Sequence, residues 1–397
     1  MSEWRRIVMD EFISLQRGYD LATPKRVPGN VPVIGAGGRS GWHDTAMVKG
    51  PGVVIGRAGA SMGQATYSTE DFWPLNTSLF VTDFHGNDPR FVYYVLDQID
   101  FSGYNSGAAQ PMLNRNYIKQ IPLSIPSLDE QISIAALLGA LDDKVAINSR
   151  LVETIDELGA ALFLGFFREA IDVLTVGSHL PCGWRQIKLE DAMSSFETGM
   201  RPRGGVARYK SGVPSVGAES IVGLARFDYS KVKYVPSDFY SRMKRGKLES
   251  HDILLYKDGG RPGSFEPHVA LFGDGFPFSE VCINEHVYRI RLKRPFTQAF
   301  GYFWLSSGYL MDEMRRRGTG VAIPGLNSLA VKGLPIVQPP ADRIGKFDSE
   351  ASPLIDRALH AAKESRVLAE LRDAMLPKLM SGEMKIRDAE RAVEEAT

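Results

Sequence analysis

The feature that most constrains this chain is an internal repeat, because a duplicated sequence must build the same fold twice. Six short segments of the first half recur, in the same order, in the second half. The sharpest match pairs residues 106–114 with residues 319–327, and both segments end in Leu-Asn. Since six ordered matches are not a chance result, we infer a duplication. The other matches pair 4–7 with 184–187, 31–36 with 213–218, 54–59 with 254–259, 91–96 with 300–305 and 118–122 with 331–335.

Each repeat has a β-rich part followed by a helical part. The β-rich parts contain short Val, Ile, Tyr and Phe runs separated by Gly, Pro, Asn and Asp, which is typical of strands and turns. Each also contains one expected helix, around 89–98 and again around 297–314. We therefore expect four regions: a first globular domain (1–127), a first helical region (128–179), a second globular domain (180–340) and a second helical region with a tail (341–397).

The first helical region starts with a capping box, Ser127-Leu128-Asp129-Glu130. An apolar stripe at spacings of three and four follows it, and Asn148 occupies the one polar position. Asn148 is either a buried, register-setting residue of a coiled coil or a half-exposed residue of an ordinary amphipathic helix. Because long helices expose apolar faces, we expect the stripes of both helical regions to dock partner proteins. The residues of these stripes are Leu138, Leu141, Val145, Asn148, Val152, Ile155, Leu368, Leu371 and Met375.

The second helical region is less regular. Ser352-Pro353 has the pattern of an N-cap followed by proline at the first helical position, which predicts a helix start there. Gly382 is a plausible stop, and the charged tail through Thr397 is expected to be frayed.

These patterns predict an α+β protein with two repeated β-rich domains separated by two long antiparallel spacer helices. A helix of ~40 residues spans ~60 Å, whereas one turn of DNA is ~34 Å long. Two such helices, packed antiparallel, would hold the domains roughly a DNA turn or more apart. The two domains would then be related by a pseudo-twofold axis, which matches the twofold relation of the strands of a duplex.

Composition excludes several classes of protein. No apolar stretch reaches the ~18–20 residues that a membrane span needs, and the N-terminus has no apolar signal core, so we expect a cytoplasmic protein without a membrane partner. The two cysteines, Cys182 and Cys282, are too few for a disulfide framework and are read as reduced structural thiols. The seven histidines show no metal-ligand spacing.

The net charge of zero conceals an uneven distribution. Residues 180–340 contain 23 Lys and Arg against 15 Asp and Glu, a net charge of +8. Residues 128–179 contain 3 against 9, a net charge of −6. A basic globular region between acidic helical ones favours nucleic-acid binding on one part of the molecule.

The sequence resembles the specificity subunits of type I restriction–modification enzymes. The resemblance is carried by the paired loops ending at Asn114 and Asn327, by residues 121–131 entering the first helix, and by residues 371–383 near the C-terminus. It covers essentially the whole chain, including the two-repeat layout. One departure is Pro339-Pro340-Ala341-Asp342-Arg343, which lacks the Glu-Gln pair of the first copy; together with Pro353 it predicts that the second helix is less continuous.

The resemblance implies a non-catalytic subunit with two target recognition domains. Each would read one half of a split site in double-stranded DNA, and the helices would act as a ruler and as docking surfaces. The implied partners are two adenine methyltransferase subunits that use S-adenosylmethionine, and endonuclease subunits that translocate DNA with ATP. No cofactor or metal is expected in this chain itself.

DNA contacts are expected from Lys and Arg on phosphates and from Arg, Lys, Asn and Gln on base edges. Arg57 and Lys257 occupy matching positions beside a glycine in the two repeats. Asn114 and Asn327 are identical in both copies, so we expect them to be structural turn or cap residues. The remaining candidates are Arg39, Lys49, Asn105, Gln110 and Arg115 in the first repeat, and Arg201, Arg203, Arg208, Lys210, Lys244, Arg245, Arg261 and Arg316 in the second.

Motifs for catalysis are absent from the sequence. It has no Asn/Asp-Pro-Pro-aromatic loop of an adenine methyltransferase, and the nearest segment is Gln338-Pro339-Pro340-Ala341. It has no phosphate-binding GxxxxGK[ST] loop, and Gly35 to Gly41 is read as a tight turn. The alternative function is a duplicated protein-interaction scaffold without DNA specificity, which the basic loops and the +8 charge of residues 180–340 disfavour.

Overall fold

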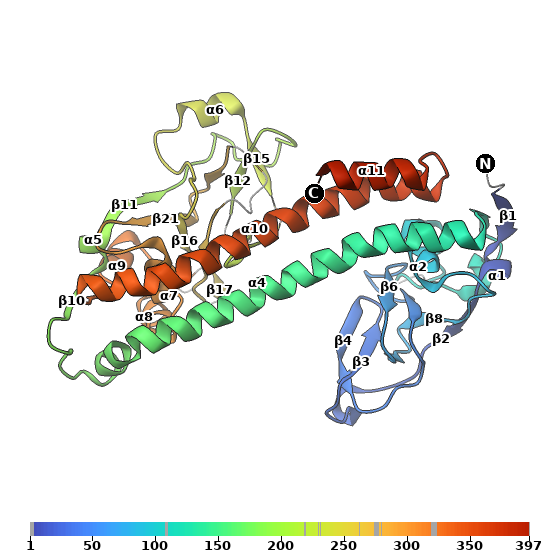
Figure 1. Cartoon of the computed structure of the whole chain (residues 1–397), viewed down its shortest axis with the longest axis horizontal. Coiled ribbons are helices and arrows are strands. Elements are labelled where there is room, and N and C mark those ends of the chain that lie inside the picture. Colours follow the sequence, from blue (N-terminus) through green and yellow to red (C-terminus); the bar gives the residue numbers. More distant parts are fainter. Residues whose placement is uncertain are drawn as a thin grey trace. The chain divides into compact units, whose positions relative to one another are not determined.

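The computed structural model describes residues 4–107, 110–217, 220–228, 230, 232–261, 263–273, 278, 280–318 and 324–396. The chain forms two compact units, which are described separately: residues 1–143 with 368–397 (unit 1) and residues 144–367 (unit 2). Each unit contains one globular head and segments of two long helices (Figure 1). We use head 1 for the described residues up to 127 and head 2 for those between 180 and 340.

Head 1 is built from three sheets. Its main sheet has the order β2-β8-β5-β6, the second β4-β3-β7 and the third β1-β9. The strands are β1 (Arg5–Val8), β2 (Ser14–Arg17), β3 (Val31–Gly35), β4 (Gly38–His43), β5 (Gly52–Gly56), β6 (Ala65–Ser68), β7 (Trp73–Pro74), β8 (Ser78–Asp83) and β9 (Pro122–Ile125). The helices are α1 (Met9–Phe12), α2 (Pro89–Gln98) and α3 (Arg115–Ile118), with 3₁₀ turns η1 (Thr23–Lys25) and η2 (Ser102–Tyr104).

Head 2 repeats these sheets as β11-β21-β16-β19, β15-β12-β20 and β10-β22, and has two further hairpins, β13-β14 and β17-β18. Its strands are β10 (Arg185–Lys188), β11 (Met193–Thr198), β12 (Val213–Val216), β13 (Ile221–Gly223), β14 (Arg226–Phe227), β15 (Lys233–Val235), β16 (Ile253–Tyr256), β17 (Gly260–Arg261), β18 (Ser264–Phe265), β19 (Val269–Leu271), β20 (Cys282–Ile283), β21 (Val287–Leu292) and β22 (Pro335–Gln338). Its helices are α5 (Leu189–Ala192), α6 (Ser237–Arg242), α7 (Gln298–Leu305), α8 (Gly308–Arg317) and α9 (Ser328–Lys332).

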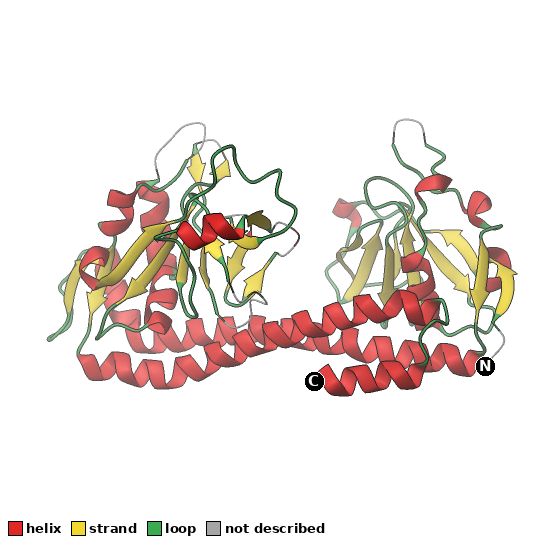
Figure 2. Ribbon diagram, turned by 90° about the horizontal axis from the view of Figure 1, so that it is seen from above, coloured by secondary structure: helices red, strands yellow, loops and turns green. Residues whose placement is uncertain are grey.

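The strand registers confirm the duplication inferred from the sequence. Val54 of β5 lies opposite Phe80 of β8, and Leu254 of β16 lies opposite Arg289 of β21, so residues 54 and 254 are equivalent. The single parallel pairing in each second sheet, β3 with β7 and β12 with β20, is repeated as well. Figure 2 shows the strands of each head, in yellow, flanked by short helices in red.

Two long helices, α4 (Leu128–Val176) and α10 (Ala341–Met380), contribute to both units. In unit 1, Arg372 Nη1 donates to Asp142 Oδ1 at 2.6 Å. In unit 2, Asn148 Nδ2 donates to Glu364 Oε2 at 2.7 Å, and Arg343 Nε donates to the Phe166 carbonyl at 2.9 Å. Within each unit the two helices are therefore antiparallel, and the α+β fold with repeated heads and long helices is confirmed.

Asn148 is only 1% exposed. Of its two predicted environments, the buried one is therefore found. Its side-chain amide donates a hydrogen bond to the Glu364 carboxylate on α10, so this buried polar group has the partner that it requires.

The second helical region differs from the prediction in two ways. Helix α10 begins at Ala341 and runs through Pro353 without interruption. Phe347, Ala351 and Ile355 on either side of Pro353 are at most 1% exposed, so core packing outweighs the ~3 kcal/mol by which a proline disfavours a helix interior. The tail predicted to be frayed is a helix, α11 (Ile386–Ala396), whose Ala389 is fully buried.

Each head approaches α4 at a glycine. A Cβ at Gly139 would lie 2.5 Å from the guanidinium carbon of Arg90 on α2, and a Cβ at Gly159 would lie 2.2 Å from the ring of Phe303 on α7. Glycine is the residue that permits such close packing. The helix predicted over 89–98 is confirmed, whereas that over 297–314 is two helices, because Ser307 caps a new start at α8.

Candidate nucleic-acid interface

In head 1, three loops meet around Arg57, directly after strand β5. Arg57 N donates to the Thr77 carbonyl at 2.9 Å, and Leu113 N donates to the Arg57 carbonyl at 2.7 Å. Gly59 N donates to the Pro111 carbonyl at 3.0 Å. These bonds join the loops after β5, before β8 and before α3 into one structure, which we call the loop junction of head 1.

Head 2 contains the same junction. Lys257 N donates to the His286 carbonyl at 2.9 Å, Leu326 N donates to the Lys257 carbonyl at 2.8 Å, and Gly259 N donates to the Pro324 carbonyl at 3.0 Å. Because the same backbone bonds recur at the same positions, Arg57 and Lys257 are structurally equivalent, as the repeat predicted.

The junction of head 1 gathers three of the predicted residues. Arg57 is half-buried, and its Nη1 donates to the Asn76 carbonyl at 3.3 Å. Gln110 is exposed and lies beside Gly59. Asn105 Oδ1 accepts from the backbone N–H groups of residues 107 and 112, at 2.9 Å each, so its oxygen is used to shape the loop.

The other predicted residues of head 1 lie elsewhere. The guanidinium of Arg39, on β4, stacks over exposed Trp42 at 4.7 Å. Lys49 is exposed ahead of β5, at the opposite end of that strand from Arg57. Arg115 begins α3, and its Nη1 donates to the Leu15 carbonyl at 3.2 Å. Head 1 therefore presents dispersed cations around one compact junction.

The basic loop 201–210 of head 2 adjoins its junction through an ion pair. Arg201 Nε lies 2.8 Å from Glu285 Oε1, next to His286. Arg203 and Lys210 are exposed. The guanidinium of Arg208 stacks on the Tyr209 ring at 4.8 Å.

The second basic segment of head 2 packs against the first. Gly246 N donates to Glu197 Oε2 at 2.7 Å, and a Cβ at Gly246 would lie 2.7 Å from the Gly199 Cα. This contact brings exposed Lys244 and Arg245 alongside the start of the 201–210 loop. Two clusters that are separate in sequence thus form one basic surface.

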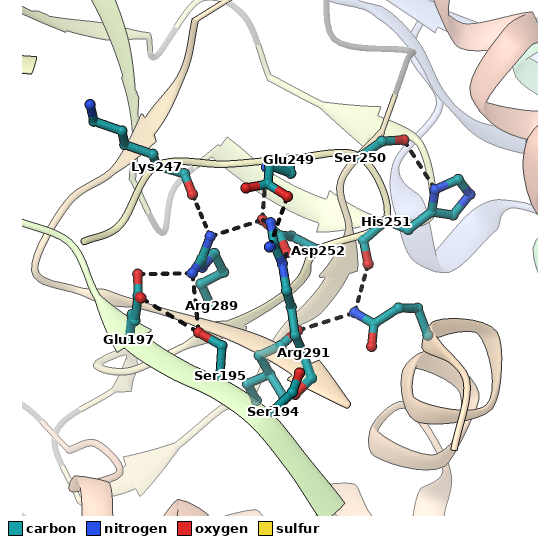
Figure 3. Close-up of polar contacts among 12 residues, drawn as sticks. Ser194, Ser195, Glu197, Lys247, Glu249, Ser250, His251, Asp252, Arg289 and Arg291 are labelled. Carbon is teal, nitrogen blue, oxygen red and sulfur yellow. Dashed lines mark hydrogen bonds and ion pairs between the residues drawn. The ribbon is translucent and has the colours of Figure 1, made fainter. Parts of the chain in front are cut away.

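A buried ion network holds this surface in place (Figure 3). Arg289 Nη1 donates to the Lys247 carbonyl at 2.6 Å, and its Nη2 lies 3.0 Å from Glu197 Oε2. Asp252 is fully buried and pairs with Arg289 at 3.6 Å and with Arg291 through a short ion pair. Because the Lys247 carbonyl is fixed by this network, the basic segment has a defined path across the head.

The third basic cluster, on α8, is neutralised by acidic side chains. Arg316 pairs with Glu313, and Arg315 lies 2.6 Å from Glu266 Oε1 and 2.9 Å from Asp312 Oδ1. The hydrogen bond from Arg315 holds the pKa of Glu266 below its ordinary value. Arg261, on hairpin β17-β18, is exposed. Arg316 is therefore the weakest of the DNA-contact candidates.

The paired asparagines have the structural role that their identity in both copies predicted. Asn114 Oδ1 accepts from Asn116 N at 3.0 Å at the start of α3. Asn327 Oδ1 accepts from Ala330 N at 2.9 Å at the start of α9. Residues 319–323, which align with 106–110, lie outside the described residues.

The helix stripes predicted to dock partners are instead part of the protein's own core. Seven of these side chains are at most 4% exposed, and the other two, Val145 and Leu371, are half-buried. The reason is that α4 and α10 pack against each other and against the heads within each unit. The large apolar side chains left exposed on α4 are Leu128, Ile132, Ile147, Leu158 and Val176, which the periodicity did not single out because it marked the buried face.

The described residues offer little for other chemistry. No group of three or more His, Cys, Asp or Glu among them is placed to hold a metal ion. No helix within the described ranges combines the length and apolarity of a membrane span. Both cysteines are free; Cys182 is exposed, and burial raises the pKa of the Cys282 thiol to about 11.

Comparison with known proteins finds similarity to a known family of DNA specificity domains. Residues 1–157 match the family model described as the type I restriction modification DNA specificity domain. The MjaIX specificity subunit of Methanocaldococcus jannaschii is 22% identical over 315 residues, which are 75% of this chain and 70% of that protein. The EcoprrI specificity subunit of Escherichia coli is 25% identical over 145 residues, 35% of this chain and 36% of that one.

A solved structure shares the fold. The S subunit of the type I restriction–modification system from M. genitalium superposes with a TM-score of 0.62 at 15% identity, covering 95% of this chain and 96% of that one. At this identity the likeness shows the fold alone. Residues 1–157 therefore match the DNA specificity domain of type I restriction–modification systems, and 75% of the chain is similar to a specificity subunit of such a system.

Proposed function

We propose that the chain reads a split target in double-stranded DNA, with one half-site read by each head. The observation that carries this proposal is the loop junction, which occurs twice with the same backbone bonds and with a cation at its centre, Arg57 or Lys257. Loops held on a rigid sheet are where binding residues concentrate. Two equivalent reading surfaces with different side chains suit two different half-sites.

The basic surface of head 2 supports a large electrostatic contribution. Arg203, Arg208 and Lys210 are exposed on one loop, and Lys244 and Arg245 are exposed on the segment packed against its start. Lysine and arginine side chains neutralise phosphates and release counterions, so that affinity falls steeply with salt. Residues 1–127 contain 11 Lys and Arg and 11 Asp and Glu, so head 1 would depend more on partner subunits for phosphate contacts.

The proposed role is recognition without catalysis. Catalysis would belong to partners: two adenine methyltransferase subunits with S-adenosylmethionine, and endonuclease subunits that translocate DNA with ATP.

The exposed apolar side chains of α4 support docking of a methyltransferase subunit on that helix, with Leu128 and Ile132 in unit 1 and Ile147 and Leu158 in unit 2. Helices α4 and α10 would set the spacing of the half-sites. A complex that acts on chromosomal DNA would be cytoplasmic.

The test is replacement of Arg201, Arg203, Arg208 and Lys210 together by alanine. We expect weaker binding of the assembled methyltransferase complex to its DNA target and a shallower salt dependence, by about 0.9 in log–log slope for each lost phosphate contact. Association with the methyltransferase should be unchanged.

The matched control removes the same charge elsewhere. Lys378, Lys385, Arg387 and Arg391 are exposed near the C-terminus, and their joint replacement by alanine should leave DNA affinity unchanged. Equal loss of affinity in both variants would mean that only net charge matters. Unchanged affinity in the first variant would remove the 201–210 loop from the interface.

A further inference from the structure

The two heads carry different side chains at positions that their strand registers make equivalent. Gln16 lies opposite Phe80 in head 1, and Glu197 lies opposite Arg289 in head 2. Counting along the chain from these residues, Asp20 corresponds to Arg201, and Asn76 corresponds to Glu285.

In both heads these two positions form a polar pair. The Asn76 amide donates to the Asp20 carboxylate in head 1. In head 2, Arg201 Nε lies 2.8 Å from Glu285 Oε1. The direction of the pair is reversed: the first segment carries the acceptor in head 1 and the donor in head 2.

The difference continues into the junction itself. In head 2, His286 Nδ1 lies 2.7 Å from Asp258 Oδ2. The equivalent positions in head 1 are Thr77 and Ala58, and the backbone bonds from Arg57 N and Lys257 N to residues 77 and 286 establish this equivalence. Head 2 therefore presents ionisable groups where head 1 presents a hydroxyl and a methyl group.

Packing fixes the backbone here but not these side chains. Both heads have glycine two residues before the polar pair, and a Cβ would lie 2.2 Å from the Leu75 carbonyl oxygen at Gly18 and 1.7 Å from the Ile283 carbonyl oxygen at Gly199. By contrast, Asp20 is exposed, and the Arg201 side chain is 61% exposed. The scaffold is the same, and the variation lies in solvent-facing groups beside the central cation.

We propose that the pairs Asp20–Asn76 and Arg201–Glu285 are the specificity-determining positions of the two heads. The inference rests on the proposed function. Their chemistry fits base edges: a carboxylate accepts from the cytosine amino group, Asn can bond adenine with two hydrogen bonds, and Arg can bond guanine in the same way. In each head the pair holds its members in place until a base edge replaces one partner.

The experiment exchanges the pairs on their matching backbones. One variant carries Asp20→Arg with Asn76→Glu, and the other carries Arg201→Asp with Glu285→Asn. Each variant, assembled with its methyltransferase subunit, selects DNA from a pool randomised around the wild-type target. A matched control exchanges the exposed ion pair of α10, as Asp342→Lys with Lys346→Asp.

We expect each pair exchange to alter base preference by about tenfold or more at one or more positions of one half-site, because a good bidentate contact contributes ~1–3 kcal/mol of discrimination. The other half-site and the spacer should be unchanged, and the control should select the wild-type target. Selection of the wild-type sequence in both half-sites by both exchanged variants would overturn the inference.

Two further measurements keep the outcome decisive. If an exchanged pair prevents folding, as judged by hydrogen exchange, the isosteric change Asp20→Asn replaces the exchange in head 1 and Glu285→Gln replaces it in head 2. Each isosteric change must then relax the base preference in the half-site read by its own head, or the inference fails. If the wild-type complex selects no split target, it is the proposed function that fails.

Discussion

At one equivalent position of their main sheets, head 1 carries an apolar side chain and head 2 carries a charged one. In head 1, Phe80 lies opposite Val54 and packs with Ile34 and Phe72 in an apolar cluster. In head 2, the residue opposite Leu254 is Arg289, which joins the ion network of Asp252. The strand order and register are nevertheless the same.

The repeated fold is therefore preserved by backbone hydrogen bonds and not by one set of core side chains. A core tolerates large changes when volume and polarity are satisfied together. A buried ion network is stable only when it is complete, because a lone buried charge costs several kcal/mol. The heads can therefore diverge in chemistry while keeping the same backbone hydrogen bonds in their loop junctions.

The largest expected effect comes from breaking the network of head 2. Asp252→Ala leaves Arg289 and Arg291 without their shared buried carboxylate, and loss of one partner of a buried pair costs about 3–5 kcal/mol. Hydrogen exchange of the full chain should show loss of protection in head 2, with head 1 unchanged.

The matched change in head 1 is Phe80→Ala. It removes a ring that is 3% exposed and should cost about 3–5 kcal/mol, with loss of protection confined to head 1. Equal loss of protection in both heads from either variant would contradict the view that each head has its own core.

Much of this comparison was accessible from the sequence because repeats align without a structure. The matches ending at Asn114 and Asn327 identified equivalent loops, and the structure confirms both residues as helix caps. The pairing of Arg57 with Lys257 is confirmed by shared backbone bonds. Sequence patterns were sufficient to predict features that depend on neighbouring residues, such as these helix caps.

Other features could not be predicted, because they depend on tertiary contacts. Pro353 reads as a helix start, yet packing of Phe347 and Ile355 carries α10 through it. The stripe of Leu138 and Val152 reads as a docking surface, yet it is buried within the chain. The ion pair of Arg201 with Glu285 joins segments that no spacing rule connects.

An intermediate effect on the pH dependence of stability is expected from two carboxyl groups of α4, one in each unit. In unit 2, burial raises the pKa of Asp156 above its ordinary value of 3.8, against the hydrogen bond from Tyr302. The folded state then holds the proton to higher pH than the unfolded state does. This contribution to stability is full below about pH 4 and is lost as the pH rises through the folded pKa.

In unit 1 the sign is opposite. The hydrogen bond from Arg90 holds the pKa of Asp143 below its ordinary value of 3.8, so its contribution is present above that value and is lost as the pH falls. The free energy of unfolding of the Asp156→Asn and Asp143→Asn variants can be measured by denaturation between about pH 3 and pH 7. Each variant should lose the pH dependence of stability that its carboxyl group contributes, and the two lost contributions should have opposite sign. Same-sign changes would contradict the assignment.

The smallest expected effects come from replacing single arginines of head 2, which compares an ion-paired arginine with one on the exposed basic loop. Arg316→Ala breaks a surface ion pair with Glu313, so stability should change by about 0–1 kcal/mol and DNA affinity should stay near that of the wild type. Arg203→Ala, on the exposed basic loop, should weaken DNA binding by comparison. Filter binding at one fixed salt concentration compares the two, and a larger loss for Arg316→Ala would reverse the ranking of the clusters.

The most direct test of two heads reading two half-sites is single-molecule methylome sequencing of cells that express this chain with the methyltransferase subunit of its own system. We expect one methylated motif made of two half-sites with a fixed spacer, which disappears when the chain is deleted. A single unbroken motif, or no new methylation although the complex assembles, would contradict it.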